Sequence, residues 1–165
     1  MSAIAMDFDF FCGSYPRSRG VGPEANEIQR REIGIEREAP GSGAKLRAAV
    51  AALAAAFVDS SAPDWDGHGA APANLASARH AVLLLREVLL VAPEIPEVSI
   101  DPDGETALEW YRGPRRVFSV SVGPSGGLTY AGIFSESKVH GVEAHMGEGL
   151  PREIRAGIQR VYASR

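Results

Sequence analysis

One stretch, residues 105–134, constrains the fold of this chain more than any other. It holds three segments in which apolar and polar residues alternate, and Gly/Pro-rich breaks separate them. Alternation of this kind is typical of strands with one buried face, and short breaks containing glycine join antiparallel neighbours. The stretch therefore predicts an antiparallel meander with one face against a core.

The alternation also predicts which side chains face that core, because successive side chains of a strand point to opposite faces. The apolar set, which we expect to be buried, comprises Leu108, Trp110, Phe118, Val120, Val122, Leu128, Tyr130 and Phe134. The opposite set comprises Glu109, Tyr111, Ser119, Ser121 and Thr129. If no helix covers this second face, it is the surface where we expect a partner to dock.

The segments on either side extend the sheet. The turn signal at residues 101–104, Asp-Pro-Asp-Gly, predicts a strand that ends near Ile100. Residues 138–144 predict a strand after the meander. The sheet should therefore have four or five strands.

Helical periodicity precedes the meander. Leu46, Val50, Leu53 and Phe57 recur at helical spacing and predict a helix that opens near Ser42, with Ser42 as its N-cap. Most of the other positions are alanine, which favours helix and lets a neighbouring helix approach closely.

A second helix is predicted from Asn74 to about Val91. Its apolar residues occupy more than one face, because Leu83 and Leu90 lie apart from the main stripe. A helix that is apolar on two sides is usually packed on two sides. We expect it between the sheet and either the first helix or a second subunit. Another helix should follow Pro151.

Together these patterns predict an α+β fold with two N-terminal helices, an antiparallel meander of four or five strands and a C-terminal helix. A chain of 165 residues fits one domain. We place this domain at residues 44–165. Residues 1–43 are rich in turn signals and mixed charges, and we interpret them as an irregular N-terminal arm.

Composition narrows the classes of function. The net charge is −4, which gives no overall electrostatic case for nucleic acid or an anionic membrane. A single cysteine excludes an internal disulfide and fits a reducing compartment. We recognise no signal peptide and no apolar run long enough to span a bilayer. We therefore expect a cytoplasmic protein that does not enter the membrane.

The most distinctive local motif is DWDGHG. Asp64, Asp66 and His68 alternate, so in an extended loop they can face one way and bind a divalent metal. His140 and His145 are the candidates to complete such a site, although nothing in their spacing requires it. This motif is the basis of one hypothesis, a small metal-dependent hydrolase.

The alternative interpretation of the same loop is structural. Trp65 would fill the core, Asp66 and Gly67 would form an Asx-type turn, and the glycines would permit unusual backbone angles. We favour this interpretation and predict no cofactor. The sequence holds no GxSxG, HExxH, P-loop or GxGxxG motif, so we assign no catalytic residue.

A basic turn follows the first segment of the meander. Arg112, Arg115 and Arg116 stand beside Tyr111, and such residues can stack on bases or bind phosphate. The same residue types are enriched at protein interaction hot spots. A solvated turn beside a core tryptophan is the alternative. Together with Glu109, these residues are our candidate partner-binding set.

The segments DWDGHGAAP and PEVSIDPDGETALEWYRGPRRVFSVSVGPSGGLTYAG carry a resemblance. They look like a group of small bacterial hypothetical proteins, in which a WDG loop precedes a helix and a meander. The resemblance covers roughly residues 64–150. It implies a compact accessory protein and assigns no functional residue.

These observations favour a non-enzymatic protein-interaction module, such as an antitoxin, an immunity or inhibitor-type protein, or an accessory subunit. It would bind another protein through the sheet face or the loops, and a homodimer is an alternative. The other two hypotheses are the metal-dependent hydrolase and a nucleic-acid-binding protein that uses Arg112, Arg115 and Arg116.

Overall fold

Five antiparallel strands form one sheet, and their order in the sheet is their order in the chain. The computed structural model describes residues 42–145 and 149–163. Its elements are α2 (Ser42–Asp59), α3 (Leu75–Val88), β1 (Glu97–Ile100), β2 (Thr106–Tyr111), β3 (Arg116–Val122), β4 (Gly127–Phe134), β5 (Ser137–Ala144) and α4 (Arg152–Tyr162). The predicted α+β meander is confirmed, with five strands.

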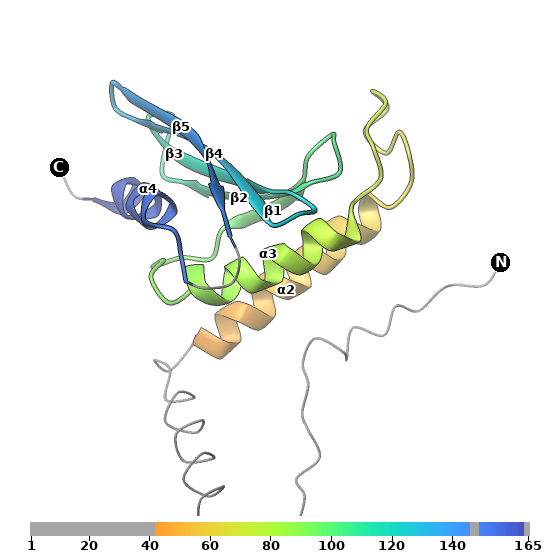
Figure 1. Cartoon of the computed structure of the whole chain (residues 1–165), viewed down its shortest axis with the longest axis horizontal. Helices are drawn as coiled ribbons and strands as arrows, with labels where there is room; N and C mark the ends of the chain where they lie inside the picture. Colours follow the sequence, from red (N-terminus) through yellow and green to blue (C-terminus); the bar gives the residue numbers. More distant parts are fainter. Residues whose placement is uncertain (1–41, 146–148, 164–165) are drawn as a thin grey trace, which may run out of the picture. The chain divides into compact units, whose positions relative to one another are not determined.

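The three described helices lie on one side of the sheet, as Figure 1 shows. Helix α2 contacts α3 and β1, α3 contacts β2 and β3, and α4 contacts β2, β3 and β4. In the described part of the chain no helix covers the other face. Helices α2 and α3 thus lie next to each other under the sheet. Helix α3 contacts both the sheet and α2, which agrees with the expectation that it packs on two sides, although α2 also contacts β1 directly. The alternative, that α3 packs against a second subunit, stays a prediction.

The predicted alternation of buried and exposed side chains is confirmed along β2, β3 and β4. Trp110 is 1% exposed, and Phe118, Val120 and Val122 are fully buried. Burial of this apolar set against the helices is the main source of stability. Tyr130 also belongs to the covered face, but it is only partly buried.

Aromatic rings fill the space between the sheet and α4. The Phe118 ring lies 5.8 Å from the Tyr130 ring and 6.2 Å from the Phe134 ring, measured between centroids. Glycines make the room for them. A Cβ atom at Gly157 would overlap the Phe118 ring, and one at Gly132 would lie 2.8 Å from it. These glycines are required for close packing, because any larger side chain would displace a ring.

A buried hydroxyl joins α3 to the sheet. Asn74 caps α3 by accepting hydrogen bonds from the backbone N–H groups of Ala76 and Ser77. The Ser77 hydroxyl, fully buried, donates to the Val122 carbonyl at 2.6 Å and accepts from the Thr106 N–H at 2.7 Å. Each of these buried polar groups is thereby satisfied.

The predicted domain boundary needs a small correction. Helix α2 starts at Ser42, so residues 42 and 43 belong to the helix and not to the arm, and Ser42 is helical and not a cap. Its buried residues are Ala49, Leu53 and Phe57, whereas Leu46 is only partly buried. The small Ala49 side chain lets the neighbouring elements come close. The rest of the predicted arm lies outside the described residues.

Candidate functional site

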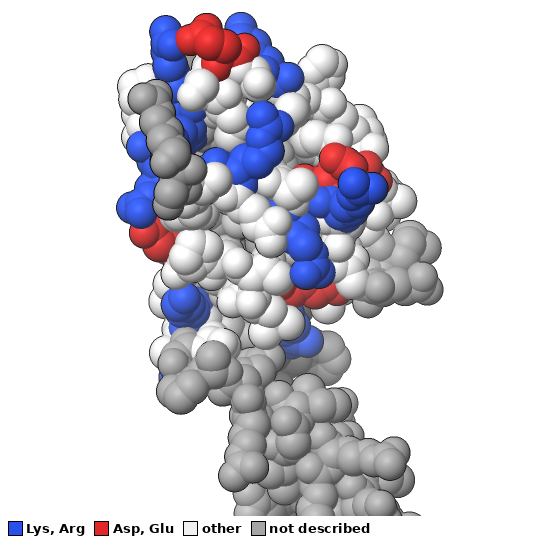
Figure 2. Space-filling model, turned by 90° about the vertical axis from the view of Figure 1, so that its left-hand side faces the viewer, with Lys and Arg blue, Asp and Glu red and all other residues white. Residues whose placement is uncertain are grey.

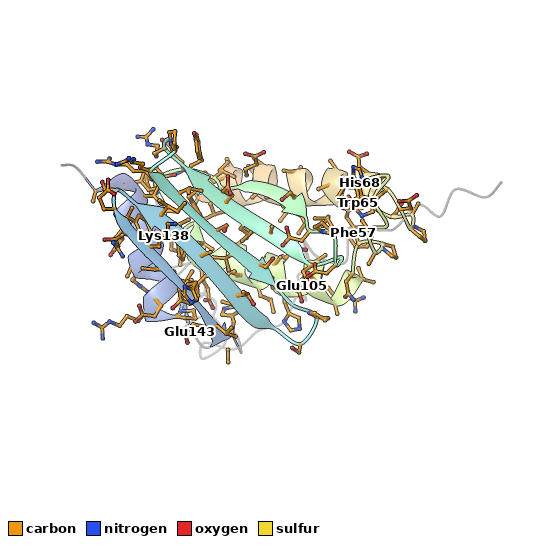
Figure 3. All side chains as sticks on the ribbon, turned by 90° about the horizontal axis from the view of Figure 1, so that it is seen from above. Phe57, Trp65, His68, Glu105, Lys138 and Glu143 are labelled. Carbon is orange, nitrogen blue, oxygen red and sulfur yellow. The ribbon has the colours of Figure 1, made fainter. Side chains whose placement is uncertain are left out.

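The face of the sheet away from the helices is hollowed. Figure 3 looks onto this face, with the helices behind it. The hollow has a volume of about 370 Å³. Its floor is made of small side chains, namely Ser99, Ala107, Ser119, Ser121, Thr129 and Ala131. Their register explains the shape, because directly opposed pairs such as Ser119 with Ala131 and Ser121 with Thr129 fill little space.

Carboxylates line the hollow on the β1–β2 side. Glu97 and Glu109 are directly opposed in the β1–β2 register, and Asp101 follows β1 and accepts a hydrogen bond from the Ser121 hydroxyl. Within residues 42–145 and 149–163, no lysine, arginine or histidine lines the hollow. Two like charges directly opposed on a sheet are destabilising. The hollow therefore presents uncompensated negative charge.

More acidic groups follow at the turn between β1 and β2. Burial raises the pKa of the Glu105 carboxyl, and the neighbouring Asp103 and Asp101 carboxylates raise it further. These three groups make one end of the sheet negative. Figure 3 shows Glu105 near this end and Lys138 near the opposite end of the strands.

Tyr111 forms the apolar end of the open face. Its side chain is 55% exposed at the end of β2. It is directly opposed to Val117 on β3, and Val117 is opposed to Ile133 on β4. An exposed aromatic beside two aliphatic side chains is a feature of protein interaction surfaces.

The predicted basic turn does not form one surface with Glu109. Arg112 pairs with Glu94 at 3.1 Å and lies over the Tyr162 ring, and Arg115 pairs with Glu136. Arg116 opens β3 on the face that the helices cover, in register with Phe134. Figure 2 looks onto the end of the molecule that lies on the left in Figure 1, and it shows basic side chains interspersed with acidic ones. The arginines are thus separate from the hollow.

The DWDGHG loop uses its carboxylates internally. Asp64 accepts a hydrogen bond from the Gly69 N–H at 2.6 Å, and Asp66 accepts from the N–H groups of His68 and Ala70 at 2.8 and 3.1 Å. The Asp66–His68 bond is the Asx turn expected at this position. Gly67 has a φ of 72°, which suits glycine and helps to close the loop.

The expectation that Trp65 fills the core is wrong. Trp65 is only partly buried, and its indole N–H donates to the Ala71 carbonyl at 3.0 Å within the same segment. His68 is exposed, and Figure 3 shows both side chains in the loop beyond Phe57. Within residues 42–145 and 149–163, no group of three His, Cys, Asp or Glu side chains is arranged to hold a metal ion. The metal hypothesis stays a prediction, which metal analysis of wild type and Asp66→Ala tests.

His145 has a partner that sequence reasoning missed. His145 is 3% exposed, and its ring nitrogen Nε2 lies 2.9 Å from the Glu87 Oε2 atom of α3. It therefore contacts α3 instead of completing a site with the loop at Asp64. The two residues are 58 positions apart, and no local pattern in the sequence indicates that they meet.

Two further surface features are weaker candidates. A hollow of about 310 Å³ between β5 and α4 is lined by Lys138, His140, Glu153 and Arg160, and the Arg160 guanidinium already lies 4.1 Å above the Phe134 ring. On α3, Leu83 is exposed and projects away from the buried stripe. Neither combines concave shape with a single sign of charge.

Within the described residues, the helices are too short or too polar for any of them to cross a membrane. Comparisons with protein-family models, curated proteins and solved structures find no match to this chain. The resemblance to small bacterial proteins therefore stays a prediction, and the geometry of the open face is the basis for the function proposed below.

Proposed function

We propose that this chain is a non-enzymatic protein-interaction module that binds another protein through the open face of its sheet. The observation that carries the proposal is the contrast between the two faces. Among the described residues, three helices cover the apolar face, whereas no helix covers the other face, which is hollowed to about 370 Å³. The classes that we propose for such a module are an antitoxin, an immunity or inhibitor-type protein, and an accessory subunit.

The size of the face fits this role. Strands about 4.8 Å apart, with about 3.3 Å per residue, give five strands of this length an area of roughly 500 Å². A standard protein interface buries about 800 Å² on each partner. The open face, which includes Tyr111 at the end of β2, would supply most of this area, and the adjoining β2–β3 turn would supply the rest. The expected contact thus includes both the sheet face and a loop.

The side chains on this face also favour binding over catalysis. Among the described residues that line the hollow, Ser119 and Ser121 have no histidine beside them, and the Ser121 hydroxyl donates a hydrogen bond to the Asp101 carboxylate. A serine nucleophile is usually activated by a histidine that a third group orients, and the described lining does not contain this arrangement. The face therefore offers hydrogen-bonding groups and charge, which give recognition.

A steric variant tests the proposal. Ser119→Trp would fill the hollow without changing its charge, and Gln159→Trp places the same side chain on the exposed side of α4. We expect affinity capture from the native host to recover one protein with wild type and with Gln159→Trp, and to lose it with Ser119→Trp. Equal recovery with Ser119→Trp would contradict the proposal. Circular dichroism checks that both variants fold.

A second copy of the chain is the alternative occupant of the open face. Light scattering of the purified protein distinguishes the two cases. If wild type is a dimer that Ser119→Trp converts to a monomer, the partner on this face is a second copy.

A further inference from the structure

We propose that the segment of the partner that enters the hollow is cationic, a stretch of polypeptide rich in lysine or arginine that meets Glu97, Asp101 and Glu109. This inference rests on the proposed function, because it assigns the chemistry of the partner for the same face.

The sign of the charge is the first argument. Of the residues that the structure describes, three carboxylates line the hollow and no basic side chain does. The ion pairs found among the described residues join Arg112 to Glu94, Arg115 to Glu136 and His145 to Glu87, all outside the hollow. In the described part of the chain, Glu97 and Glu109 thus have no ion-pair partner. A face with one uncompensated sign of charge attracts a partner of the opposite sign.

The register of β1 and β2 is the second argument. Glu97 and Glu109 are directly opposed, which brings their Cβ atoms to about 5 Å from each other. The free protein therefore contains a repulsion that its own described residues do not relieve. A guanidinium or ammonium group placed between the two carboxylates would convert the repulsion into charge-assisted hydrogen bonds.

The shape of the floor is the third argument. Ser99, Ala107 and Ser119 are short, so the floor leaves space for long side chains to lie across it. Lysine and arginine place their aliphatic stems on such a surface while the charged group reaches its partner. At one end of the strand, the exposed Tyr111 ring offers a face for a cation–π contact.

Nucleic acid is the competing occupant, and the same charges disfavour it. Phosphates would be repelled by the three carboxylates of the hollow. The turn that would attract phosphate has two of its three arginines, Arg112 and Arg115, already paired with glutamates.

The test uses the full chain and three labelled probes, namely a nona-arginine peptide, a neutral Gly-Ser peptide of equal length and a single-stranded oligonucleotide. Fluorescence anisotropy measures binding at two salt concentrations. We expect nona-arginine to bind, with an affinity that falls as salt rises, and the other two probes not to bind.

Charge-neutralising variants locate the site. Glu97→Gln and Glu109→Gln should each weaken nona-arginine binding by about two- to fivefold, the range of an exposed ion pair. Each should also leave the melting temperature unchanged or raise it, because the repulsion within the pair is removed. Glu153→Gln on α4 makes the same change of charge outside the hollow and should leave binding unchanged.

Three results would overturn the inference. Equal weakening by all three variants would mean that nona-arginine senses only net charge. Binding of the oligonucleotide in place of nona-arginine would assign the surface to nucleic acid. If nona-arginine does not bind, the partner has no cationic segment at this site. If Ser119→Trp still abolishes capture of the native partner, the proposed function remains intact.

Discussion

At the scale of single residues, the fold depends on buried side chains that satisfy polar backbone groups of the sheet. Ser77 is the clearest example, because its hydroxyl serves a backbone donor and a backbone acceptor from two different strands. Removal of such a group leaves a buried amide without its acceptor, and that desolvation cost exceeds the net value of the bond.

Ser77→Ala should therefore destabilise the protein by roughly 1–3 kcal/mol, mainly because the Thr106 N–H and Val122 carbonyl lose their partner. Urea unfolding followed by tryptophan fluorescence measures the change. Ser125→Ala, at an exposed turn position, is the matched control and should change stability by less than about 0.5 kcal/mol. Similar small effects for both variants would show that the buried hydroxyl contributes little.

Glu105 gives a prediction about pH. Burial and the neighbouring carboxylates raise the pKa of Glu105 above its ordinary value of 4.5, so the folded state binds this proton more tightly than the unfolded state. The resulting contribution to stability is complete below pH 4.5 and is lost as the pH rises through the folded pKa.

Above that range the charged carboxylate is unfavourable, so Glu105→Gln should stabilise the protein at pH 7 by up to roughly 0.5 kcal/mol. The difference from wild type should disappear below pH 4.5, where both side chains are neutral. Thermal unfolding at several pH values measures it. A variant that is less stable than wild type at pH 7 would mean that the charged form makes a favourable contact.

At the scale of elements, close approach decides which positions tolerate change. Gly157 lies inside α4, where alanine is normally better than glycine by roughly 0.5–1 kcal/mol. Here the added methyl group would overlap the Phe118 ring. Since Phe118 is fully buried between α4 and the sheet, it has little space to move.

We therefore expect Gly157→Ala to destabilise the protein by about 1–3 kcal/mol through overpacking. Gly43→Ala in α2 is the control, because a Cβ atom there would meet only the end of the Arg47 side chain at 3.6 Å. That variant should be neutral or slightly more stable. If Gly157→Ala is also stabilising, α4 packs on the sheet less closely than described. Chemical denaturation of the two variants beside wild type gives both values.

The sequence patterns predict the helices and strands, and they predict which face of the sheet each strand side chain occupies. Alternation has a period of two, so the positions of Leu108 and Trp110 fix the face of every residue in β2. The side-chain contacts between these elements are harder to predict from the sequence. Nothing local connects Ser77 with Thr106, or His145 with Glu87, because these pairs meet only when α3 packs on the sheet.

The sequence predicts only part of the candidate site, because the rest depends on contacts between strands that no local pattern indicates. Alternation placed Glu109 and Tyr111 on the uncovered face, as the structure has them. The hollow depends on which small residues oppose each other, and therefore on a register that the sequence alone does not give. The sequence predicts Trp65 in the core because tryptophan is highly buried on average, but Trp65 is only partly buried and its indole donates to the Ala71 carbonyl within its own loop segment.

At the scale of the whole molecule, the two faces of the sheet in the described domain differ both in charge and in whether helices cover them. One face of the sheet is apolar and covered by helices, and the other is uncovered in the described domain, with acidic side chains along its hollow. Basic side chains lie at the end of the sheet that carries the β2–β3 turn, where Arg112 and Arg115 form ion pairs with glutamates. A partner that carries positive charge would thus be directed to the hollow before it makes close contact.

The most direct test of this account is the reactivity of cysteines introduced at two neighbouring positions of β4, Thr129→Cys and Leu128→Cys, in a Cys12→Ser background. Thr129 lies exposed in the hollow, and Leu128 is fully buried under the helices. We expect a maleimide to react rapidly with Thr129→Cys, more slowly when nona-arginine is bound, and with Leu128→Cys only after unfolding. Equal protection of both positions in the free protein would contradict the account, because it would show that the supposedly open face is covered.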